Sequence, residues 1–116
     1  MADGRCMFCA IADGELPSTV VYEDDEVLAF RDIAPRAPVH VLVVPRRHLV
    51  SVMDLADGEV PLLGRLFAAI GEVARREGVA DSGFRVVSNA GRNGGQTVAH
   101  LHFHVLGGRF MTWPPG

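Results

Sequence analysis

The sequence has little cysteine, no long apolar run and no excess of positive charge, and each absence excludes a class of protein. No stretch approaches the roughly 18 uninterrupted apolar residues of a membrane span. The N-terminal residues 1–5 carry no apolar core of signal-peptide length. The formal net charge of −3 argues against sequence-independent nucleic-acid binding, which needs a broad positive surface. We therefore expect a cytoplasmic protein that binds neither membrane nor nucleic acid.

The sequence also lacks internal repeats, low-complexity tracts and any linker long enough to divide the chain. Hydrophobic residues make up 48% and charged residues 22% of the 116 residues, which is the balance of an ordinary globular protein. A chain of this length supports one core but not two. We expect residues 1–116 to form a single domain, and a small anionic ligand remains compatible with its charge.

The pattern of apolar residues predicts an α+β fold, with a five-stranded, mainly antiparallel sheet, one long helix and one short helix. In the long helix, 60–77, apolar residues recur at intervals of three and four, and Gly78 is a suitable end. Its apolar face comprises Leu62, Leu63, Leu66, Phe67, Ile70, Val73 and Ala74. The short helix is predicted at 6–13 and the strands at Val20–Tyr22, Val27–Arg31, Val39–Val44, Phe84–Ser88 and His100–Leu106.

Three histidines alternate with apolar residues in the run His100-Leu101-His102-Phe103-His104. Successive side chains of a strand point to opposite faces, so the three imidazoles share one face. Neighbouring imidazoles would then be rooted roughly 6.5–7 Å apart on a rigid element. This spacing suits groups placed along a phosphate and its substituents. A purely structural role is the alternative, but three buried imidazoles would all need hydrogen-bond partners.

A metal site built from all three histidines is an alternative, but it fits this geometry less well than a site that uses only one of them. Imidazole is a common metal ligand. However, side chains rooted side by side on one extended strand diverge, and zinc–nitrogen bonds are only about 2.0–2.1 Å long. One of the three histidines as a metal ligand therefore remains open.

The run HLHFHVL resembles the histidine-triad (HIT) family, whose defining motif is His-φ-His-φ-His-φ-φ with φ apolar. The segments YEDDEVLAFRDIAPRAPVHVLVVPRRH and NAGRNGGQTVAHLHFHVLGG extend this resemblance from about Cys6 to the last residue. The tail GGRFMTWPPG is similar to the Hint branch of nucleotide-binding proteins, more than to the Fhit or galactose-1-phosphate uridylyltransferase branches. Thr97 departs from this pattern, because the Fhit branch has threonine there and many Hint proteins have serine.

The resemblance implies that His102, the middle histidine, attacks the α-phosphorus of a nucleotide. A covalent nucleotidyl-imidazole then forms, the leaving group departs, and water releases the nucleoside monophosphate. A large share of free imidazole is neutral at pH 7, because its reference pKa is about 6.5. Covalent catalysis divides one difficult displacement into two easier ones. A backbone carbonyl on the other ring nitrogen would fix the tautomer of this histidine.

Donors for the phosphoryl oxygens follow from the same resemblance, since charge that develops there must be met by groups placed in advance. His104 is one donor, His40 matches an additional histidine on the neighbouring strand, and 96–98 would supply backbone N–H groups. The pair Gly94-Gly95 would let the backbone approach the phosphate, although it is also an ordinary turn signal. The implied catalytic set is His102, His104, His40 and Thr97.

The resemblance also implies which residues bind the ribose and the base. Asp32 matches a carboxylate that accepts hydrogen bonds from both ribose hydroxyls, although an aspartate before Pro35 also favours a turn. Several apolar residues match a purine slot, although they could equally belong to the ordinary core. Trp113 would reach the site of a partner chain, with an exposed tail residue without a role as the alternative. The implied nucleotide-binding set is Phe8, Ile11, Phe30, Asp32, Ile33, Leu42, Asn89, Gln96, Thr97, Val98, His104 and Trp113.

The two cysteines, Cys6 and Cys9, have the spacing of half a tetrahedral zinc site. A redox role would need a thioredoxin-like context, which the sequence lacks. Many bacterial histidine-triad proteins complete such a pair with two histidines, which match His48 and His100. The resemblance thus implies a structural zinc on these four residues, with free thiols as the alternative. Eukaryotic Hint proteins lack the cysteines, so the chain departs from that branch here.

The resemblance implies a hydrolase that cleaves the P–N bond of purine nucleoside phosphoramidates, such as AMP or GMP joined to an amine or to lysine. A dinucleoside-polyphosphate hydrolase is the alternative enzyme, and a nucleotide-binding interaction module without turnover is the alternative of another class. The resemblance also implies a homodimer with a ten-stranded sheet, in which the long helix and central strand pair across a two-fold axis. The apolar helix agrees with a dimer and equally with a monomer's core.

Overall fold

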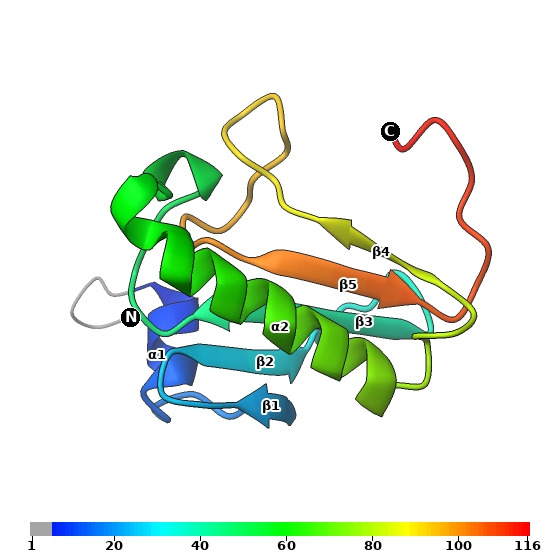
Figure 1. Cartoon of the computed structure of the whole chain (residues 1–116), viewed down its shortest axis with the longest axis horizontal. Coiled ribbons are helices and arrows are strands. Elements are labelled where there is room, and N and C mark those ends of the chain that lie inside the picture. The colour runs from blue at the N-terminus through cyan, green and yellow to red at the C-terminus, as the bar shows by residue number, and fades with distance from the viewer. Residues whose placement is uncertain (1–5) are drawn as a thin grey trace.

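The computed structural model describes residues 6–116, which form one five-stranded sheet with a helix on each face (Figure 1). The predicted α+β fold is therefore confirmed. Residues 1–5, where no signal peptide was expected, lie outside the described part. The strand order is β1-β2-β3-β5-β4, and every neighbouring pair is antiparallel. The elements are α1 (Met7–Ala12), β1 (Val20–Glu23), β2 (Val27–Arg31), β3 (Val39–Pro45), α2 (Val60–Arg76), β4 (Phe84–Val87) and β5 (Phe103–Gly107).

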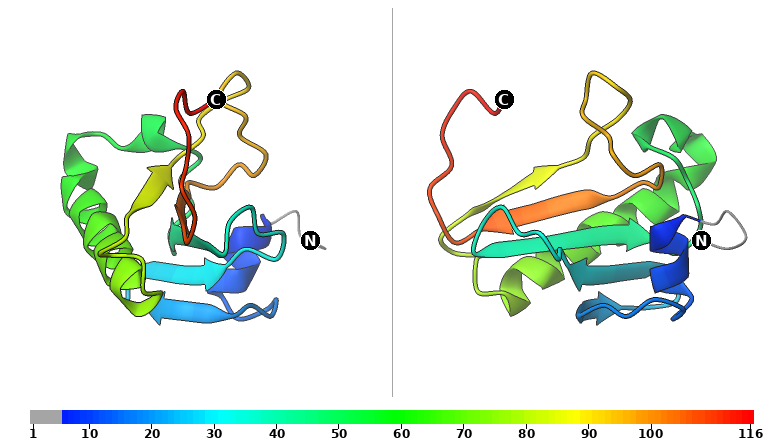
Figure 2. Two further views of the ribbon diagram at one scale, coloured as in Figure 1. Left: turned by 90° about the vertical axis from the view of Figure 1, so that its right-hand side faces the viewer. Right: turned by 180° about the vertical axis from the view of Figure 1, so that it is seen from behind.

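The two faces of the sheet are covered by different helices, as the left view of Figure 2 shows. Helix α2 packs on one face and α1 on the other, and the alternation of strand side chains divides the apolar residues between two cores. The α2 core takes Val27, Ala29, Val41, Val43, Phe103 and Val105 from the sheet and Leu101 from the segment before β5. The α1 core takes Leu28, Phe30, Leu42 and Val44, together with Phe8 of the helix.

Helix α2 begins after two short 3-10 turns that the sequence pattern did not predict, at Val52–Asp54 and Asp57–Glu59. It ends at Arg76, and Gly78 adopts φ 75°, so the predicted glycine stop is confirmed. Phe67 belongs to the predicted apolar face but is 49% exposed, because it lies at the margin of that face. Its ring packs edge-on against Phe103 at 5.3 Å.

Strand β5 begins at Phe103, three residues later than the predicted start at His100. Its ladder with β3 ends where Phe103 pairs with Val43. Beyond that point Pro45 has no N–H to donate, and the carbonyl oxygen of Pro45 lies 2.8 Å from Nε2 of His100. The Leu101 N–H instead donates to the carbonyl oxygen of Leu49. The prediction of a strand from His100 is therefore wrong, although the alternation of faces continues through these residues.

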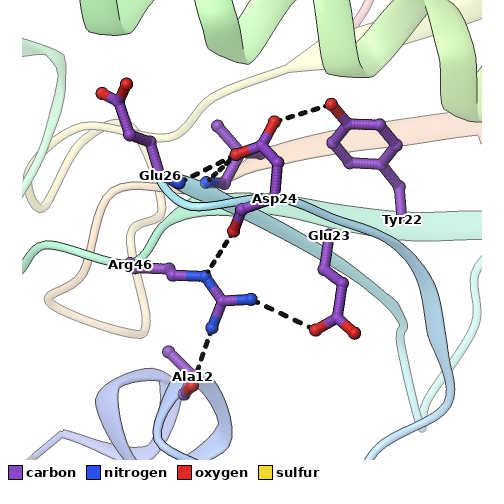
Figure 3. A network of polar contacts seen from close by, with 7 residues as sticks. Ala12, Tyr22, Glu23, Asp24, Glu26 and Arg46 are labelled. Carbon is purple, nitrogen blue, oxygen red and sulfur yellow. Dashed lines mark hydrogen bonds and ion pairs between the residues drawn. The ribbon is translucent and has the colours of Figure 1, made fainter.

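The turn between β1 and β2 is fastened to α1 by Asp24 and Arg46 (Figure 3). The carboxylate of Asp24 accepts hydrogen bonds from the N–H groups of Glu26 and Val27 and from the Tyr22 hydroxyl. The guanidinium of Arg46 donates to the Asp24 carbonyl oxygen at 2.7 Å and to the last carbonyl of α1, that of Ala12, at 2.9 Å. This network holds the short helix against the sheet, although α1 makes only a few helical hydrogen bonds of its own.

The edges of the sheet are β1 and β4. Strand β4 presents Phe84 and Val86, which are 37% and 36% exposed. The C-terminal tail follows β5 at the end of the sheet opposite α1, as Figure 1 shows. The homodimer with a ten-stranded sheet stays a prediction.

Candidate functional site

The middle histidine of the motif, His102, is 5% exposed on the α1 face. Its Nδ1 lies 2.7 Å from the carbonyl oxygen of His100. A carbonyl oxygen can only accept, so Nδ1 carries the proton and Nε2 carries the lone pair. Phe8 of α1 packs edge-on against the His102 ring at 5.2 Å. His102 is thus held in one tautomer and one orientation, with a nucleophilic nitrogen.

His104 lies beside His102, with ring centroids 5.0 Å apart. It is opposite Leu42 of β3, and therefore on the α1 face of the sheet. Burial, with a smaller contribution from the neighbouring imidazoles of His102 and His40, lowers the pKa of His104 to about 4. His104 is therefore neutral at pH 7, and it can donate a hydrogen bond to an anion but carries no positive charge.

His40 and Asp32 complete the polar side of this group. His40 is 6% exposed on β3, and burial lowers its pKa despite the nearby Asp32 carboxylate. Its Nε2 lies 2.9 Å from Nδ1 of His104 and 3.4 Å from Oδ2 of Asp32. Oδ1 of Asp32 accepts a hydrogen bond from the Ala34 N–H at 2.8 Å. The turn role considered for Asp32 is therefore present, and its second oxygen faces His40.

A cavity of about 380 Å³ opens between α1 and the ends of β2 and β3. His102 and His104 line it, with Asp32, Thr97 and Val98 nearby on the same wall. All five apolar residues of the predicted purine slot also line it, namely Phe8, Ile11, Phe30, Ile33 and Leu42. The structure thus gathers most of the predicted phosphate, ribose and base residues around one cavity, but its lining residues do not include His40, Asn89, Gln96 or Trp113. Ile33 is 96% exposed, so it lies at the mouth.

The cavity also has lining residues that the sequence analysis missed. The loop after α1 contributes Leu16, Pro17 and Ser18, and Met7 and Arg31 complete the wall. The sequence analysis missed these residues because no residue type in this loop signals a ligand. The guanidinium of Arg31 forms an ion pair with Glu77 at 2.8 Å. Arg31 therefore borders the cavity, but its positive charge is paired with Glu77, just after the end of α2.

The loop before the histidines uses the Gln96 side chain for its own structure. The Gln96 amide donates to the carbonyl oxygens of Val50 and Val98, and its oxygen accepts from the Gly91 N–H. The backbone N–H of Gln96 donates to the Gly91 carbonyl. Of the three N–H groups expected to bind phosphate, that of Gln96 is therefore already used. Within the described residues, the N–H groups of Thr97 and Val98 have no partner in the chain.

Two other predicted loop residues are separate from the cavity wall. The Asn89 side chain donates to the Gly94 carbonyl at 2.6 Å and braces the turn. Gly94 leaves no room for a side chain, because an added Cβ would lie 2.3 Å from the Ala90 oxygen. The glycine pair is therefore required by the turn itself, and Asn89 holds that turn closed.

The cysteine pair meets two distant histidines at the start of α1. The ligand atoms of Cys6, Cys9, His48 and His100 all lie within 4.8 Å of one another. The four sulfur–nitrogen distances lie between 3.2 and 3.5 Å. In a tetrahedral zinc site with Zn–S of about 2.3 Å and Zn–N of about 2.0–2.1 Å, the sulfur–nitrogen distance is about 3.5–3.6 Å. The four residues therefore fit one tetrahedral metal ion.

The tautomer of His100 supports the same assignment. Its Nε2 lies 2.8 Å from the carbonyl oxygen of Pro45, which can only accept. Nε2 therefore carries the proton, and the unprotonated Nδ1 faces the two cysteine sulfurs. A histidine that binds a metal through one nitrogen almost always donates from the other to a carbonyl, carboxylate or water. His100 thus belongs to the cysteine–histidine group that could hold a metal ion, and it does not line the cavity.

Trp113 is 80% exposed on the C-terminal tail and does not reach the cavity of its own chain. The guanidinium of Arg85 lies over its ring at 5.8 Å, and Arg85 also donates to the carbonyls of Met111 and Thr112. The tail is thereby anchored to β4. A role of Trp113 at a partner's site stays a prediction.

Comparisons with known proteins agree with this geometry. A family model described as the HIT domain matches residues 13–111. The chain is 50% identical over 112 residues to a 14 kDa zinc-binding protein of Brassica juncea, with 95% of this chain and 98% of that protein covered. It is 48% identical over 117 residues to a protein of Arabidopsis thaliana named adenylylsulfatase HINT1, with 99% and 79% covered.

A solved structure shows the same likeness in three dimensions. The HIT family hydrolase from Legionella pneumophila Philadelphia 1 superposes with a TM-score of 0.94 at 48% identity, and the match covers 97% of this chain and 100% of that chain. The sequence likeness, the shared fold and the three-histidine motif therefore agree. On these grounds the chain belongs to the HIT family.

Proposed function

We propose that this HIT protein hydrolyses the P–N bond of purine nucleoside phosphoramidates, such as AMP or GMP joined to an amine, through a covalent nucleotidyl-His102. The observation that carries the proposal is the bond from His102 Nδ1 to the His100 carbonyl, which leaves a nucleophilic nitrogen at the cavity. Solved structures named as HIT family hydrolases support it, since they share the fold at 44–48% identity.

The chemistry proceeds in two balanced steps. In the first, the Nε2 lone pair of His102 attacks the α-phosphorus, and the P–N bond breaks with its electron pair going to the nitrogen, which leaves as an amine after taking a proton from solvent. In the second, water attacks the phosphorus, the bond to Nε2 breaks, and the nucleoside monophosphate and a proton are released. The His100 carbonyl supports the positive charge that His102 carries between these steps.

The phosphoryl oxygens are met by donors already in place. His104 donates from its ring, and the N–H groups of Thr97 and Val98 are the backbone donors that remain available. Removing one such preorganised donor costs about 10²–10³ in kcat in an acyl-transfer site. Asp32 accepts the ribose hydroxyls, and the apolar slot takes the purine.

A zinc ion is proposed for the group formed by Cys6, Cys9, His48 and His100. When bound, it supplies a structural link between the start of α1 and the residues before β5. The plant relatives named zinc-binding proteins support this identity of the metal. No catalytic step is assigned to the ion, because its ligands leave no position open for a substrate.

The test compares wild-type protein with His102→Asn on adenosine 5′-phosphoramidate and diadenosine tetraphosphate. We expect AMP release from the phosphoramidate, abolished by the substitution, and slow or no cleavage of the dinucleotide. Quenching in alkali should trap an acid-labile AMP adduct in the wild type. The chain contains no lysine, so a lysine adduct is excluded. Faster cleavage of the dinucleotide would favour a dinucleoside-polyphosphate hydrolase. Tight AMP binding with no turnover of either substrate would favour a nucleotide-binding interaction module.

Adenylyl sulfate is a second candidate substrate, because a relative at 48% identity is named an adenylylsulfatase. Attack by His102 on its phosphorus would release sulfate in place of an amine, and the later steps would be the same. Measuring kcat/KM for adenylyl sulfate and for the phosphoramidate in one assay ranks the two. A higher value for adenylyl sulfate would replace the phosphoramidate as the preferred substrate.

A further inference from the structure

We propose that His40 is a positioning residue, and that it holds His104 in the single tautomer that carries its proton on Nε2. The consequence for catalysis rests on the proposed function, in which His104 donates to a phosphoryl oxygen. The tautomer itself does not depend on any substrate. It follows from a chain of hydrogen bonds that begins at the main chain of Arg36.

The first link fixes the tautomer of His40. The backbone N–H of Arg36 lies 3.0 Å from Nδ1 of His40. An amide N–H can only donate, so Nδ1 of His40 must accept and carries no proton. In the neutral ring the proton is therefore on Nε2. The position of Oδ2 of Asp32, 3.4 Å from Nε2, agrees, because a carboxylate is an acceptor.

The second hydrogen bond fixes the tautomer of His104. Nε2 of His40 lies 2.9 Å from Nδ1 of His104, and since Nε2 of His40 carries the proton, Nδ1 of His104 must accept. The remaining proton of a neutral His104 is then on Nε2, the ring nitrogen not engaged by His40. His104 lines the cavity, and its Nε2–H is the ring donor left for a phosphoryl oxygen in the proposed reaction.

The sheet explains why these two rings meet. His104 is opposite Leu42, and His40 is two residues before Leu42 on β3. The two histidines are therefore diagonal neighbours on one face, within reach of long side chains. Without His40, a free imidazole would populate both tautomers. A hydrogen-bond donor that is present in only part of the molecules would stabilise the charge of the transition state less.

The same polarity argues against a metal ion in this cluster. The ligand atoms of Asp32, His40 and His104 also lie within 4.8 Å of one another. A metal bound at Nε2 of His40 would require the proton to move to Nδ1, where it would face the Arg36 N–H. His100 shows the opposite arrangement, because its second nitrogen donates to the Pro45 carbonyl. The hydrogen bonds of this cluster therefore fix which ring nitrogen of each histidine carries the proton.

The test uses two substitutions of similar size, His40→Leu and His40→Gln. Leucine removes both hydrogen bonds, whereas glutamine keeps an amide that can donate toward His104 and accept from Arg36. Nitrogen NMR of the ring nitrogens reads the tautomer of His104 without any substrate, with His104→Gln to assign its signals. Thermal unfolding checks that each variant is folded. Steady-state kinetics with adenosine 5′-phosphoramidate then separate kcat from KM.

We expect wild-type His104 to be protonated at Nε2 and unprotonated at Nδ1. His40→Leu should show a mixture of tautomers and a kcat lowered by roughly tenfold to a hundredfold, with KM changed by less than about threefold. His40→Gln should recover most of the kcat and the single tautomer. An unchanged tautomer in a folded His40→Leu protein would overturn the proposal, and so would a glutamine variant that has the wild-type tautomer but the leucine variant's kcat. If the wild type has no activity, the proposed function fails, and the NMR result still decides the tautomer.

Discussion

The Nδ1 atom of His102 lies 2.7 Å from the carbonyl oxygen of His100, so the proposed nucleophile is oriented by a residue whose own side chain belongs to the metal-binding group. Phe8 of α1 packs against both rings, with centroids 5.9 Å from His100 and 5.2 Å from His102. The metal-binding group and the cavity therefore share one helix and one stretch of main chain.

Removing the proposed zinc ion should weaken nucleotide binding. Met7, Phe8 and Ile11 form one wall of the cavity, and α1 begins at the cysteines that would hold the ion. If metal removal leaves α1 docked in a tenth of the molecules, the apparent Kd for AMP rises roughly tenfold. Calorimetry of AMP binding after chelation measures this, and hydrogen exchange should speed up in α1 but not in β3. Restoring zinc should restore the Kd; an unchanged Kd in folded, metal-free protein would contradict the prediction.

Asp32→Asn should lower affinity for ribonucleotides selectively. The amide keeps the oxygen that accepts the Ala34 N–H, but it loses the negative charge proposed to accept the ribose hydroxyls. Because hydrogen bonds to a charged group are worth about 1.5–3 kcal/mol, the Kd for AMP should rise by roughly tenfold or more. The control ligand is 2′,3′-dideoxy-AMP, whose Kd should differ little between the two proteins. An equal loss for both ligands would assign Asp32 to the turn alone.

Gln96→Glu should lower kcat by displacing the phosphate-binding backbone. A carboxylate at this position would face the carbonyl oxygens of Val50 and Val98, to which the amide now donates. A displacement of about 1 Å can cost roughly a hundredfold in rate, so we expect a loss of that order in a folded protein. Arg92→Ala, on the exposed part of the same loop, is the matched control and should retain wild-type kinetics. Wild-type kcat in the glutamate variant would remove Gln96 from this role.

Asp24→Asn should destabilise the protein more at neutral pH than in acid. Partial burial alone would raise the pKa of Asp24, but hydrogen bonds from the Tyr22 hydroxyl and from two backbone N–H groups lower it to about 2. The folded state therefore favours the charged form, and this stability is present above pH 4 and is lost as the pH falls toward 2. The difference corresponds to about 2 kcal/mol near pH 7.

Denaturant unfolding of wild type and Asp24→Asn at pH 7 and pH 3 measures the effect. The gap between the two proteins should shrink at the lower pH. Tyr22→Phe removes only the hydroxyl that donates to Asp24 and should cost a smaller part of the same stability. A gap that is independent of pH would show that the loss comes from packing and not from the charge.

Alternation along the chain was enough to predict which side of the sheet each residue of the motif faces. The imidazoles of His102 and His104 lie on the α1 face, and Leu101 and Phe103 pack in the α2 core. Strand alternation depends only on local geometry, so it survives errors in the strand bounds. The start of β5 could not be predicted, because it depends on Pro45 and Leu49, which lie some fifty residues away.

The roles within the loop before the motif were harder to predict. Gln96 was assigned to phosphate through its backbone, but that N–H is bound to Gly91 and its side chain ties together three segments. Nothing in the residue type distinguishes these uses, since an amide can serve a loop or a ligand. The same limit applies to Ser18, whose place in the cavity wall depends on how the chain folds back after α1.

The alternation of 100–106 also has a consequence for how errors in folding are removed. A shift of β5 by one residue would place apolar side chains at the cavity and imidazoles in the core against α2. A molecule in the wrong register would therefore lose its chemistry and its packing together. Misfolded chains expose apolar surface and are the species that aggregate. The molecules that stay in solution would therefore also be those whose histidines face the cavity.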